Sequence, residues 1–440
     1  MNEQYSDDFI TECVPGKLKL FPFQYSGVRF LAERKRALIA SDPGTGKTVM
    51  LITAVNTIAV ERLADPKKLN VLVLCPKSMK LTWGREIEKW STGRGNQINW
   101  EVHNWDKLVY EKRVADLKKT KWDIIIGDES HQAIKNPGAV RCKVFLKKMI
   151  TGVERVWIAT ATPASKSGLD YYCTLCLLLP GLVDKWTARS FEQQFCERVP
   201  DPFSPAGYVY KGFANLHILK ELFSKCCIRH RKEVVLPDLP PKRYSNIEVV
   251  VPESIVADFL DINEDYVASL IEKGEPLPGH IAHVMQACAL AKVDDVVDLV
   301  SNYPEGESLV LFAWHRSVVH ALVKGIKGIG REVESITGEI TSEIIRQNIV
   351  DRFQKKELKL LVLNMQSGGV GLTLTAASTA IYIELPHSPI HLVQSENRIH
   401  RIGTEHRSVN IVRVLGKGTI DESIFRTLDY RIKSMEKVGV

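Results

Sequence analysis

The chain has 440 residues, of which 45% are hydrophobic and 25% charged, with a formal net charge of +7. This length and composition predict about two to three folded domains and argue against a disordered chain. The positive charge permits a polyanionic partner without requiring one. The apolar run Leu175–Leu179 is stopped by Pro180 and is too short to cross a bilayer, so no membrane association is expected.

Nine cysteines are scattered along a chain that shows no secretory leader. Such thiols are expected to remain reduced, which predicts an intracellular protein, cytoplasmic in a prokaryote or virus and nuclear in a eukaryote. Cys173 and Cys176 have zinc-like spacing, but no second cysteine pair or histidine pair accompanies them. A helix core is therefore the better interpretation, and no zinc site is assigned.

The first predicted strand, Arg36–Ala40, leads into a loop of the type that holds phosphates. The loop, Ser41–Thr48, follows the pattern G-x-x-x-x-G-K-[ST], with Ser41 in place of the first glycine, and a helix is expected to begin near Val49. Backbone N–H groups at such a helix start bind anions. Lys47 is predicted to reach the β- and γ-phosphates of a nucleoside triphosphate, and the Thr48 hydroxyl to bind Mg²⁺. The other loop residues expected to bind the nucleotide are Pro43, Gly44, Thr45 and Gly46.

Three more apolar runs, Asn70–Cys75, Trp122–Gly127 and Arg155–Ala159, predict strands of a parallel sheet that is covered on both faces. Asp128 and Glu129 follow the second run directly, at a carboxyl end where open α/β sheets bind ligands. We expect Asp128 to hold Mg²⁺ and Glu129 to orient or deprotonate the water that attacks the γ-phosphate.

From about residue 165 to about 300, helical patterns and prolines replace the strand pattern. The strand pattern then returns at Leu309–Ala313, Leu360–Asn364, Ala380–Glu384 and Val409–Arg413. Two α/β sheets with a helical middle account for this order, and the proline-rich Leu236–Lys242 is the expected connection between them.

Arg398 and Arg401 stand three residues apart, so on a helix they share one face and point at one target. Guanidinium groups are permanently charged and match phosphate oxygens in a fork. We therefore predict that both stabilise the charge on the transferring γ-phosphoryl group, which requires the second sheet to close onto nucleotide bound by the first.

Taken in order, these motifs resemble those of the superfamily-two helicase-type ATPases, and within them the Swi/Snf-related translocases of double-stranded DNA. The resemblance covers nearly the whole chain, and its layout is most similar to the annealing-helicase, fork-remodelling branch. The segments that carry it are Leu20–Leu31, Leu74–Trp83, Val102–Trp105, Asp128–Pro137, Ala159–Pro163, Ile228–Lys242, Phe312–His315, Thr337–Glu339, Ser367–Leu374 and Gln394–Thr404.

The resemblance implies an α/β fold of two RecA-like parallel-sheet lobes with helical insertions. The first lobe would span residues 1–240 with a helical protrusion at about 165–235. The second would span 241–440 with an insertion at about 250–300 and a C-terminal helix. That helix has an apolar residue at every fourth position, namely Ile420, Ile424, Leu428 and Ile432.

The resemblance also implies individual roles. Gln24 is the expected reader of the adenine edge, and Gly371 belongs to a glycine-rich loop that contacts DNA and nucleotide. Asn397 departs from the family pattern, which usually has Asp there.

The predicted function is a DNA-dependent ATPase that steps along duplex or branched DNA with little sequence preference. A strand-separating helicase on DNA or RNA is the alternative, and a non-catalytic scaffold is disfavoured because the catalytic residues are all present. A protein partner is left open.

For two sets of residues, two roles remain open. The basic residues Arg229, Arg231 and Lys232 are expected to contact either DNA phosphates or carboxylates of the first lobe. The tryptophans Trp83, Trp90 and Trp105 either stack on bases or, as the preferred interpretation, pack in the interior.

Overall fold

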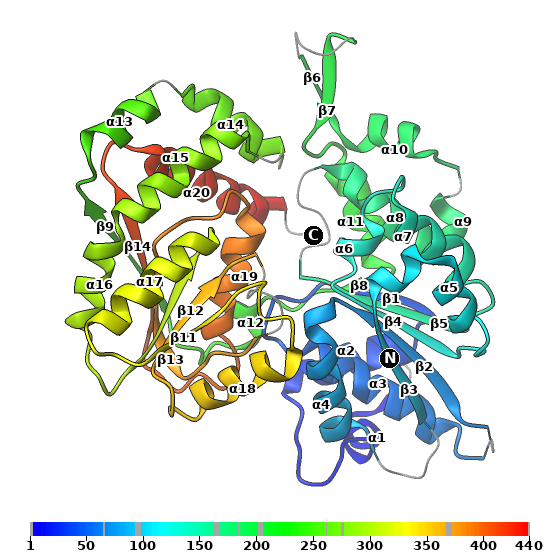
Figure 1. The fold of residues 1–440 in the computed structure, drawn as a ribbon. Helices are drawn as coiled ribbons and strands as arrows, with labels where there is room; N and C mark the ends of the chain where they lie inside the picture. The colour runs from blue at the N-terminus through cyan, green and yellow to red at the C-terminus, as the bar shows by residue number, and fades with distance from the viewer. Residues whose placement is uncertain are drawn as a thin grey trace. The chain divides into compact units, whose positions relative to one another are not determined.

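The computed structural model describes residues 3–64, 67–92, 98–161, 167–183, 185–200, 206–260, 262–273, 277–366 and 372–438. The chain divides into two compact units, Met1–Pro237 and Asp238–Gly439. Each unit is built around one six-stranded parallel sheet with helices on both faces (Figure 1). The predicted fold class, two RecA-like parallel-sheet lobes with helical insertions, is confirmed.

The first sheet has the strand order β3-β2-β4-β5-β1-β8. Its strands are β1 (Arg36–Ile39), β2 (Leu69–Cys75), β3 (Ile98–Asn104), β4 (Ile124–Asp128), β5 (Arg155–Ala159) and β8 (Cys227–Ile228). Alternate residues of the central strands enter different cores, so that Leu72 and Leu74 pack on one face while Val71 and Val73 pack on the other. Burial on both faces explains the continuous apolar runs.

Helices from the start of the chain cover one face of this sheet: α1 (Asp7–Glu12), α2 (Pro22–Ala32), α3 (Lys47–Glu61) and α4 (Lys80–Trp90). Later helices cover the other face: α5 (Glu111–Leu117), α6 (His131–Ile134), α7 (Val140–Val144), α8 (Tyr172–Leu178), α9 (Pro180–Val183), α10 (Ala188–Phe195) and α11 (Leu216–Ser224). After β8 the chain forms one more short helix, α12 (Lys232–Val235).

The second sheet has the order β11-β12-β10-β13-β14-β9. Its strands are β9 (Lys242–Val249), β10 (Ser308–Ala313), β11 (Val333–Ile336), β12 (Leu360–Asn364), β13 (Ala377–Tyr382) and β14 (Val409–Gly416). One face is covered by α16 (Val293–Ser301) and α17 (Arg316–Gly328). The other carries α13 (Glu253–Leu260), α14 (Glu264–Lys273), α15 (Gly279–Ala291), α18 (Glu343–Gln354), α19 (Pro389–Ile399) and α20 (Ile420–Val438).

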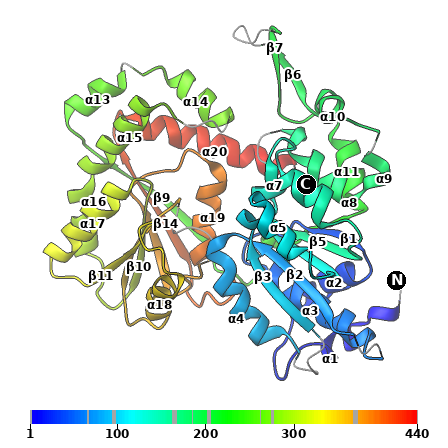
Figure 2. The same cartoon turned by 45° about the vertical axis from the view of Figure 1, so that its right-hand side comes forward.

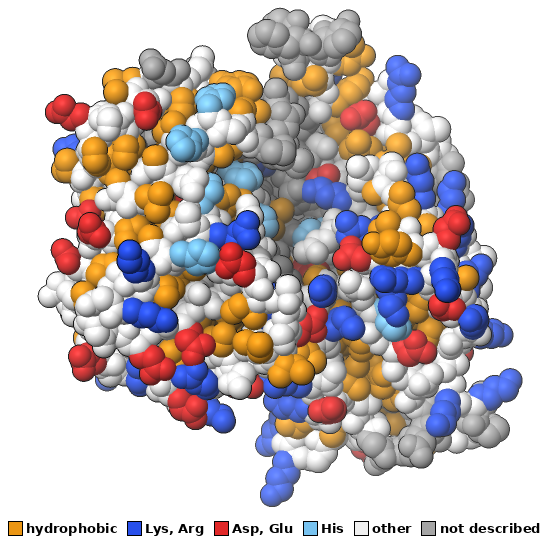
Figure 3. All heavy atoms as spheres, in the orientation of Figure 1, with side chains coloured by type: hydrophobic (Ala, Val, Ile, Leu, Met, Phe, Trp, Pro, Cys, Tyr) orange, Lys and Arg blue, Asp and Glu red, His pale blue; other side chains and the backbone are white. Residues whose placement is uncertain are grey.

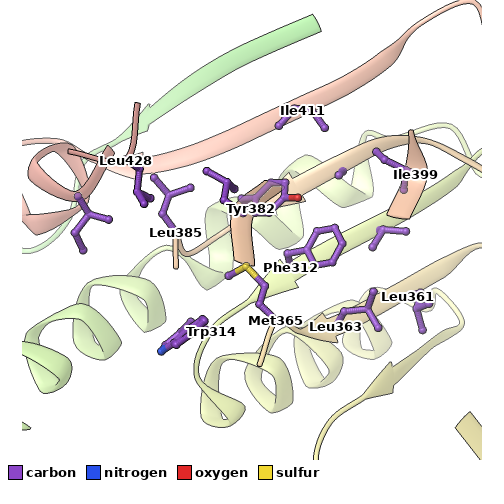
Figure 4. Close-up of a cluster of buried hydrophobic side chains, with 14 of the residues drawn as sticks. Phe312, Trp314, Leu361, Leu363, Met365, Tyr382, Leu385, Ile399, Ile411 and Leu428 are labelled. Atoms are coloured by element: carbon purple, nitrogen blue, oxygen red, sulfur yellow. The ribbon is translucent and has the colours of Figure 1, made fainter. Parts of the chain in front are cut away.

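The larger core of the second unit lies on that latter face (Figure 4). Phe312 of β10 stacks on Tyr382 of β13, with ring centroids 4.9 Å apart. The predicted apolar stripe of α20 packs against this core, with Ile420, Ile424 and Leu428 fully buried. The C-terminal helix is thereby fixed to the second sheet.

Four strands of the two parallel sheets escaped the sequence prediction, and all four are edge strands: β3 and β8 of the first sheet, β11 and β9 of the second. An edge strand is partly exposed and therefore lacks a continuous apolar run. The helical stretch expected from 165 to 300 also contains an antiparallel hairpin, β6 (Glu197–Pro200) and β7 (Tyr208–Lys211), which stands away from the first sheet in both views (Figures 1 and 2).

All nine cysteines are free thiols, and seven of them are buried. Cys173 and Cys176 lie in α8, as the helix-core interpretation requires. Within the described parts of the chain, no helix combines the length and apolarity that crossing a membrane requires.

Candidate active site

The loop after β1 has the backbone of a phosphate-binding loop. Gly44 and Gly46 adopt φ angles of 83° and 81°, a left-handed conformation that residues with a Cβ enter only with strain. Thr45 is fully buried, and its hydroxyl donates to a backbone oxygen of the same loop at 2.8 Å. Pro43, which precedes the first of these glycines, is partly exposed.

Lys47 and Thr48 are the first two residues of α3, so both lie where the helix N-terminus favours negative charge. The Lys47 ammonium donates to the backbone oxygens of Ser41 at 2.9 Å and Asp42 at 3.2 Å. These contacts hold the positive charge over the loop that would receive the phosphates.

Gln24, in the first turn of α2, is almost fully buried against this loop. Its Nε2 donates to the Thr45 backbone oxygen at 3.0 Å, and its Oε1 accepts from the Phe21 backbone N–H at 3.0 Å. A Cβ at Gly46 would lie only 2.3 Å from Nε2. The side chain therefore supports the loop directly, while adenine recognition by Gln24 stays a prediction.

Asp128 is the last residue of β4 and is held by indole groups from two other elements. Trp83 of α4 donates its Nε1–H to Oδ2 at 2.9 Å, and Trp105 donates to the Asp128 backbone oxygen at 2.8 Å. The other carboxylate oxygen accepts from the Glu129 backbone N–H at 2.9 Å. A Cβ at Gly127 would approach the Trp105 ring to 2.9 Å, so the ring can occupy this place only because residue 127 is glycine.

The Asp128 carboxyl is a strongly perturbed group. Its pKa is raised to about 6, mainly by burial and also by the charge of Glu129, while the Trp83 hydrogen bond and the Lys47 charge oppose the rise. Lys47, Asp128 and Glu129 therefore share one electrostatic environment at the carboxyl edge of the first sheet. A buried carboxyl that favours protonation is a ready receptor for a cation.

Glu129 has a φ of 45°, which is uncommon for a residue with a side chain. Its carboxylate lies 3.3 Å from Nδ1 of His131, and the same nitrogen is hydrogen-bonded to the Thr160 hydroxyl at 2.9 Å. The acidic pair is thus connected to the end of β5. Thr162 and Pro163, which belong to the same predicted motif, lie outside the described residues.

In the second unit, Arg398 and Arg401 both contact the segment that follows the glycine-rich loop. Arg398 is nearly buried and donates to the Leu372 backbone oxygen at 3.5 Å. Arg401 donates to the Thr373 hydroxyl at 2.7 Å. Gly371, predicted to contact nucleotide, lies outside the described residues.

Contrary to the prediction from their spacing, Arg398 and Arg401 do not share a helix face. Helix α19 ends at Ile399, and His400 at its C-cap has non-helical angles, so Arg401 lies beyond the helix. The two guanidinium groups contact adjacent residues because the chain turns, not because they share a helix face. Asn397 donates to the Val393 backbone oxygen at 2.7 Å, within the helix itself.

A hollow of about 940 Å³ opens at the carboxyl ends of β10 and β12 in the second unit. Trp314 lies in its wall, with the rings of His387 and His391 edge-on at 4.7 and 5.5 Å. Figure 3 shows histidine side chains gathered on this unit. Burial lowers the pKa of His387, and the neighbouring His391 and His315 lower it further, so the ring is neutral at pH 7.

The open interpretation of the tryptophans resolves toward the interior of the first unit, while that of the basic residues stays open apart from one contact. Trp83, Trp90 and Trp105 are all buried. Arg229 lies 3.7 Å from the Asp42 carboxylate, which is one of the two partner classes considered. The polar role of the indoles was not visible in the sequence, because nothing local to Trp83 or Trp105 indicates a partner on β4.

Comparison with known proteins places this architecture. Residues 23–107 and 103–254 match the SNF2-related domain, and residues 291–403 match the helicase conserved C-terminal domain. The chain belongs to the SNF2-related family. The family predicted from the motifs is therefore confirmed.

The SNF2-related chain has relatives among curated proteins. It is 29% identical to the Xenopus tropicalis SWI/SNF-related matrix-associated actin-dependent regulator of chromatin subfamily A-like protein 1, over 96% of this chain and 45% of the relative. It is 28% identical to the human DNA annealing helicase and endonuclease ZRANB3, over 96% of this chain and 41% of that protein. The chain thus spans less than half the length of these relatives.

A solved Sulfolobus solfataricus SWI2/SNF2 ATPase core in complex with double-stranded DNA aligns with 94% of this chain and 91% of that chain. The sequence identity is 21% and the TM-score 0.43.

Proposed function

We propose that this SNF2-related chain is a DNA-dependent ATPase that hydrolyses ATP between its two lobes and moves along duplex or branched DNA. The observation that carries the proposal is the gathering of Lys47, Asp128 and Glu129 at one edge of the first sheet, next to a loop with left-handed glycines. Membership in the family and the names of its annealing-helicase relatives support DNA as the polymer.

The residues present fit ATP and Mg²⁺. Lys47 and the loop N–H groups bind the phosphates, and the buried Asp128 carboxyl with the Thr48 hydroxyl would hold the ion. Bound Mg²⁺ would neutralise charge on the phosphate oxygens. Glu129 orients the attacking water and accepts its proton, with His131 holding the carboxylate. Arg398 and Arg401 supply positive charge for the transferring phosphoryl group.

The test is the ATPase rate of the purified chain at one fixed salt concentration, measured without nucleic acid and with single strands, duplexes, forks and RNA. The proposal expects at least about tenfold stimulation by duplex or forked DNA, with stimulation falling steeply as salt rises. Equal rates with and without duplex DNA would overturn it. Strand displacement on tailed duplexes would instead favour a strand-separating helicase.

A further inference from the structure

The segment that joins the two units begins with β8, and its backbone is hydrogen-bonded to β1 and to the start of the phosphate loop. Backbone oxygens of Cys226, Ile228 and His230 accept from the N–H groups of Leu38, Ala40 and Asp42 at 2.8, 2.9 and 3.1 Å. Strand β1 ends before the last two of these contacts, so the parallel ladder continues past the strand and into the loop.

The His230 side chain strengthens this attachment. One ring nitrogen is hydrogen-bonded to the Ser41 hydroxyl and the other to the Ser26 hydroxyl of α2, both at 2.9 Å. The Ser41 oxygen also accepts from the His230 backbone N–H at 3.1 Å. The ring is buried beside Phe23, and burial lowers its pKa, so the contact is one of neutral groups.

Ser41 is the position where the phosphate-loop pattern has its first glycine. The structure supplies a reason for the hydroxyl, since Ser41 is fully buried and receives both a ring and a backbone contact from His230. The next loop residue, Asp42, accepts from the Lys232 backbone N–H at 2.9 Å. The joining segment therefore holds two consecutive residues of the loop.

The far end of the same segment contacts α19 of the second unit, which carries Arg398 and is called the arginine helix below. Glu396 of α19 is almost fully buried, and one of its oxygens accepts from Lys242 at 2.9 Å and from the Tyr244 hydroxyl at 3.0 Å. Its other oxygen lies 3.5 Å from Arg413. His400, at the C-cap of α19, donates to the Pro240 backbone oxygen at 2.9 Å.

These anchors bracket Arg398, since Glu396 precedes it by two residues and His400 follows it by two. Residues 236–241, which lie between Lys232 and Lys242, contain three prolines in six residues. Proline-rich chain is stiff and extended, so a displacement at one end is passed to the other instead of being absorbed.

We propose that residues 226–244 act as a strut that couples the phosphate loop to the arginine helix, with His230 and Glu396 as its positioning residues. The inference rests on the proposed function, because it concerns the connection between the segments that carry Lys47 and Arg398. Neither residue needs to touch nucleotide; each acts through the segment it holds.

Amide hydrogen exchange in the free protein tests the strut without using activity. His230→Phe keeps a ring and removes both side-chain hydrogen bonds, so exchange at Ala40 and Asp42 should rise at least about tenfold. Gln194→Met is the matched control, because it removes one 2.7 Å hydrogen bond from Trp186 elsewhere in the same unit. It should leave Ala40 and Asp42 unchanged.

The distinguishing variant lies in the other unit. Glu396→Gln should raise exchange at the same two amides about threefold, and four flexible residues inserted after Asp238 should abolish that effect. Lys242→Met removes the same contact and serves if Glu396→Gln does not fold. Unchanged exchange at Ala40 and Asp42 in Glu396→Gln or Lys242→Met, without the insertion, overturns the strut, whatever the ATPase rates are.

Turnover gives a second, independent reading. His230→Phe and the insertion should each lower DNA-stimulated kcat about tenfold, with the KM for ATP changed less than about threefold. Combined, they should cost no more than the worse of the two, since both break one coupling. Losses that multiply to about a hundredfold would show independent defects and overturn the proposal. A parental chain that DNA fails to stimulate counts against the proposed function, and the exchange experiment still decides the strut.

Discussion

The first unit surrounds its candidate catalytic carboxyl with neutral donors, whereas the second unit embeds its arginine segment among buried ion pairs. Asp128 receives an indole N–H and a backbone N–H. Glu396 is instead paired with Lys242 and faces Arg413. The raised pKa of Asp128 shows that its charge is not compensated by the protein alone.

This difference distinguishes a buried charge that can bind a ligand from buried charges that hold structural elements together. A buried charge that the fold leaves uncompensated attracts a ligand, while a paired one fixes the elements that carry it. The second unit has another such pair, in which the fully buried Lys292 contacts Asp421 at 2.5 Å and the Val414 backbone oxygen at 2.9 Å. This pair ties α16 and α20 to the sheet.

The largest expected effect tests whether the chemistry resides in the first unit. Glu129→Gln keeps the side-chain size and removes the carboxylate, so kcat should fall about 100- to 10,000-fold while ATP binding survives. Steady-state kinetics and a fluorescent ATP analogue measure the two quantities. Glu154→Gln, which removes a carboxylate paired with Arg62 in the same unit, is the control. Near-parental turnover in Glu129→Gln would remove Glu129 from the water-activating role.

The next prediction addresses support in the second unit. Lys292→Met leaves Asp421 buried without its cation and should lower the free energy of unfolding by about 3–5 kcal/mol. Urea denaturation measures the loss. Lys327→Met, at an exposed position of α17, should stay within about 0.5 kcal/mol of the parent. A loss below about 1 kcal/mol in Lys292→Met would mean that the ion pair does not hold α20 in place.

The uncompensated carboxyl predicts a pH dependence of opposite sign from that of an ordinary acidic residue. Because the pKa of Asp128 is raised to about 6, the folded chain keeps a proton that the unfolded chain has already released. Its contribution to stability is complete below about pH 4 and is lost as pH rises through about 6, a change of about 2–3 kcal/mol. The difference in unfolding free energy between the parent and Asp128→Asn, without Mg²⁺ or nucleotide, isolates this contribution. A difference that does not vary with pH would contradict it.

The smallest expected effect concerns the neutral donors. The Trp83 hydrogen bond lowers the pKa of Asp128, so Trp83→Phe should move the midpoint of that pH dependence upward by about 0.5–1 pH unit. A packing defect alone would lower stability without moving the midpoint. Trp100→Phe, which removes a 3.2 Å hydrogen bond to Ser91, should leave the midpoint in place.

Some elements of the fold and of the site could be predicted from the sequence, and others could not. The central strands were predictable because burial on both faces requires apolar runs, and the phosphate loop and acidic pair because each is contiguous. The edge strands β3, β8, β9 and β11 were not, since partial exposure removes the apolar run. The sequence also placed the end of strand β13 at Glu384, whereas the strand ends at Tyr382.

The supporting contacts of the site were out of reach for another reason. Trp83 lies 45 residues from Asp128, and His230 lies 189 residues from Ser41. No local spacing encodes such pairs, because they arise only when strands distant in sequence become neighbours. The end of the helix before Arg401 could not be predicted either. The residue pattern of Gln394–Ile399 is typical of a continuous helix, and nothing in it indicates that the helix ends at Ile399 with His400 as its C-cap.

The thiols have a practical consequence. A maleimide needs an accessible thiolate, and burial raises the pKa of Cys226, Cys227 and Cys288 to about 12. Seven of the nine native cysteines are buried. One surface cysteine could therefore be introduced in each unit and labelled with a fluorophore while the native cysteines, most of them buried, are kept. The two fluorophores would report changes in the distance between their attachment sites during turnover.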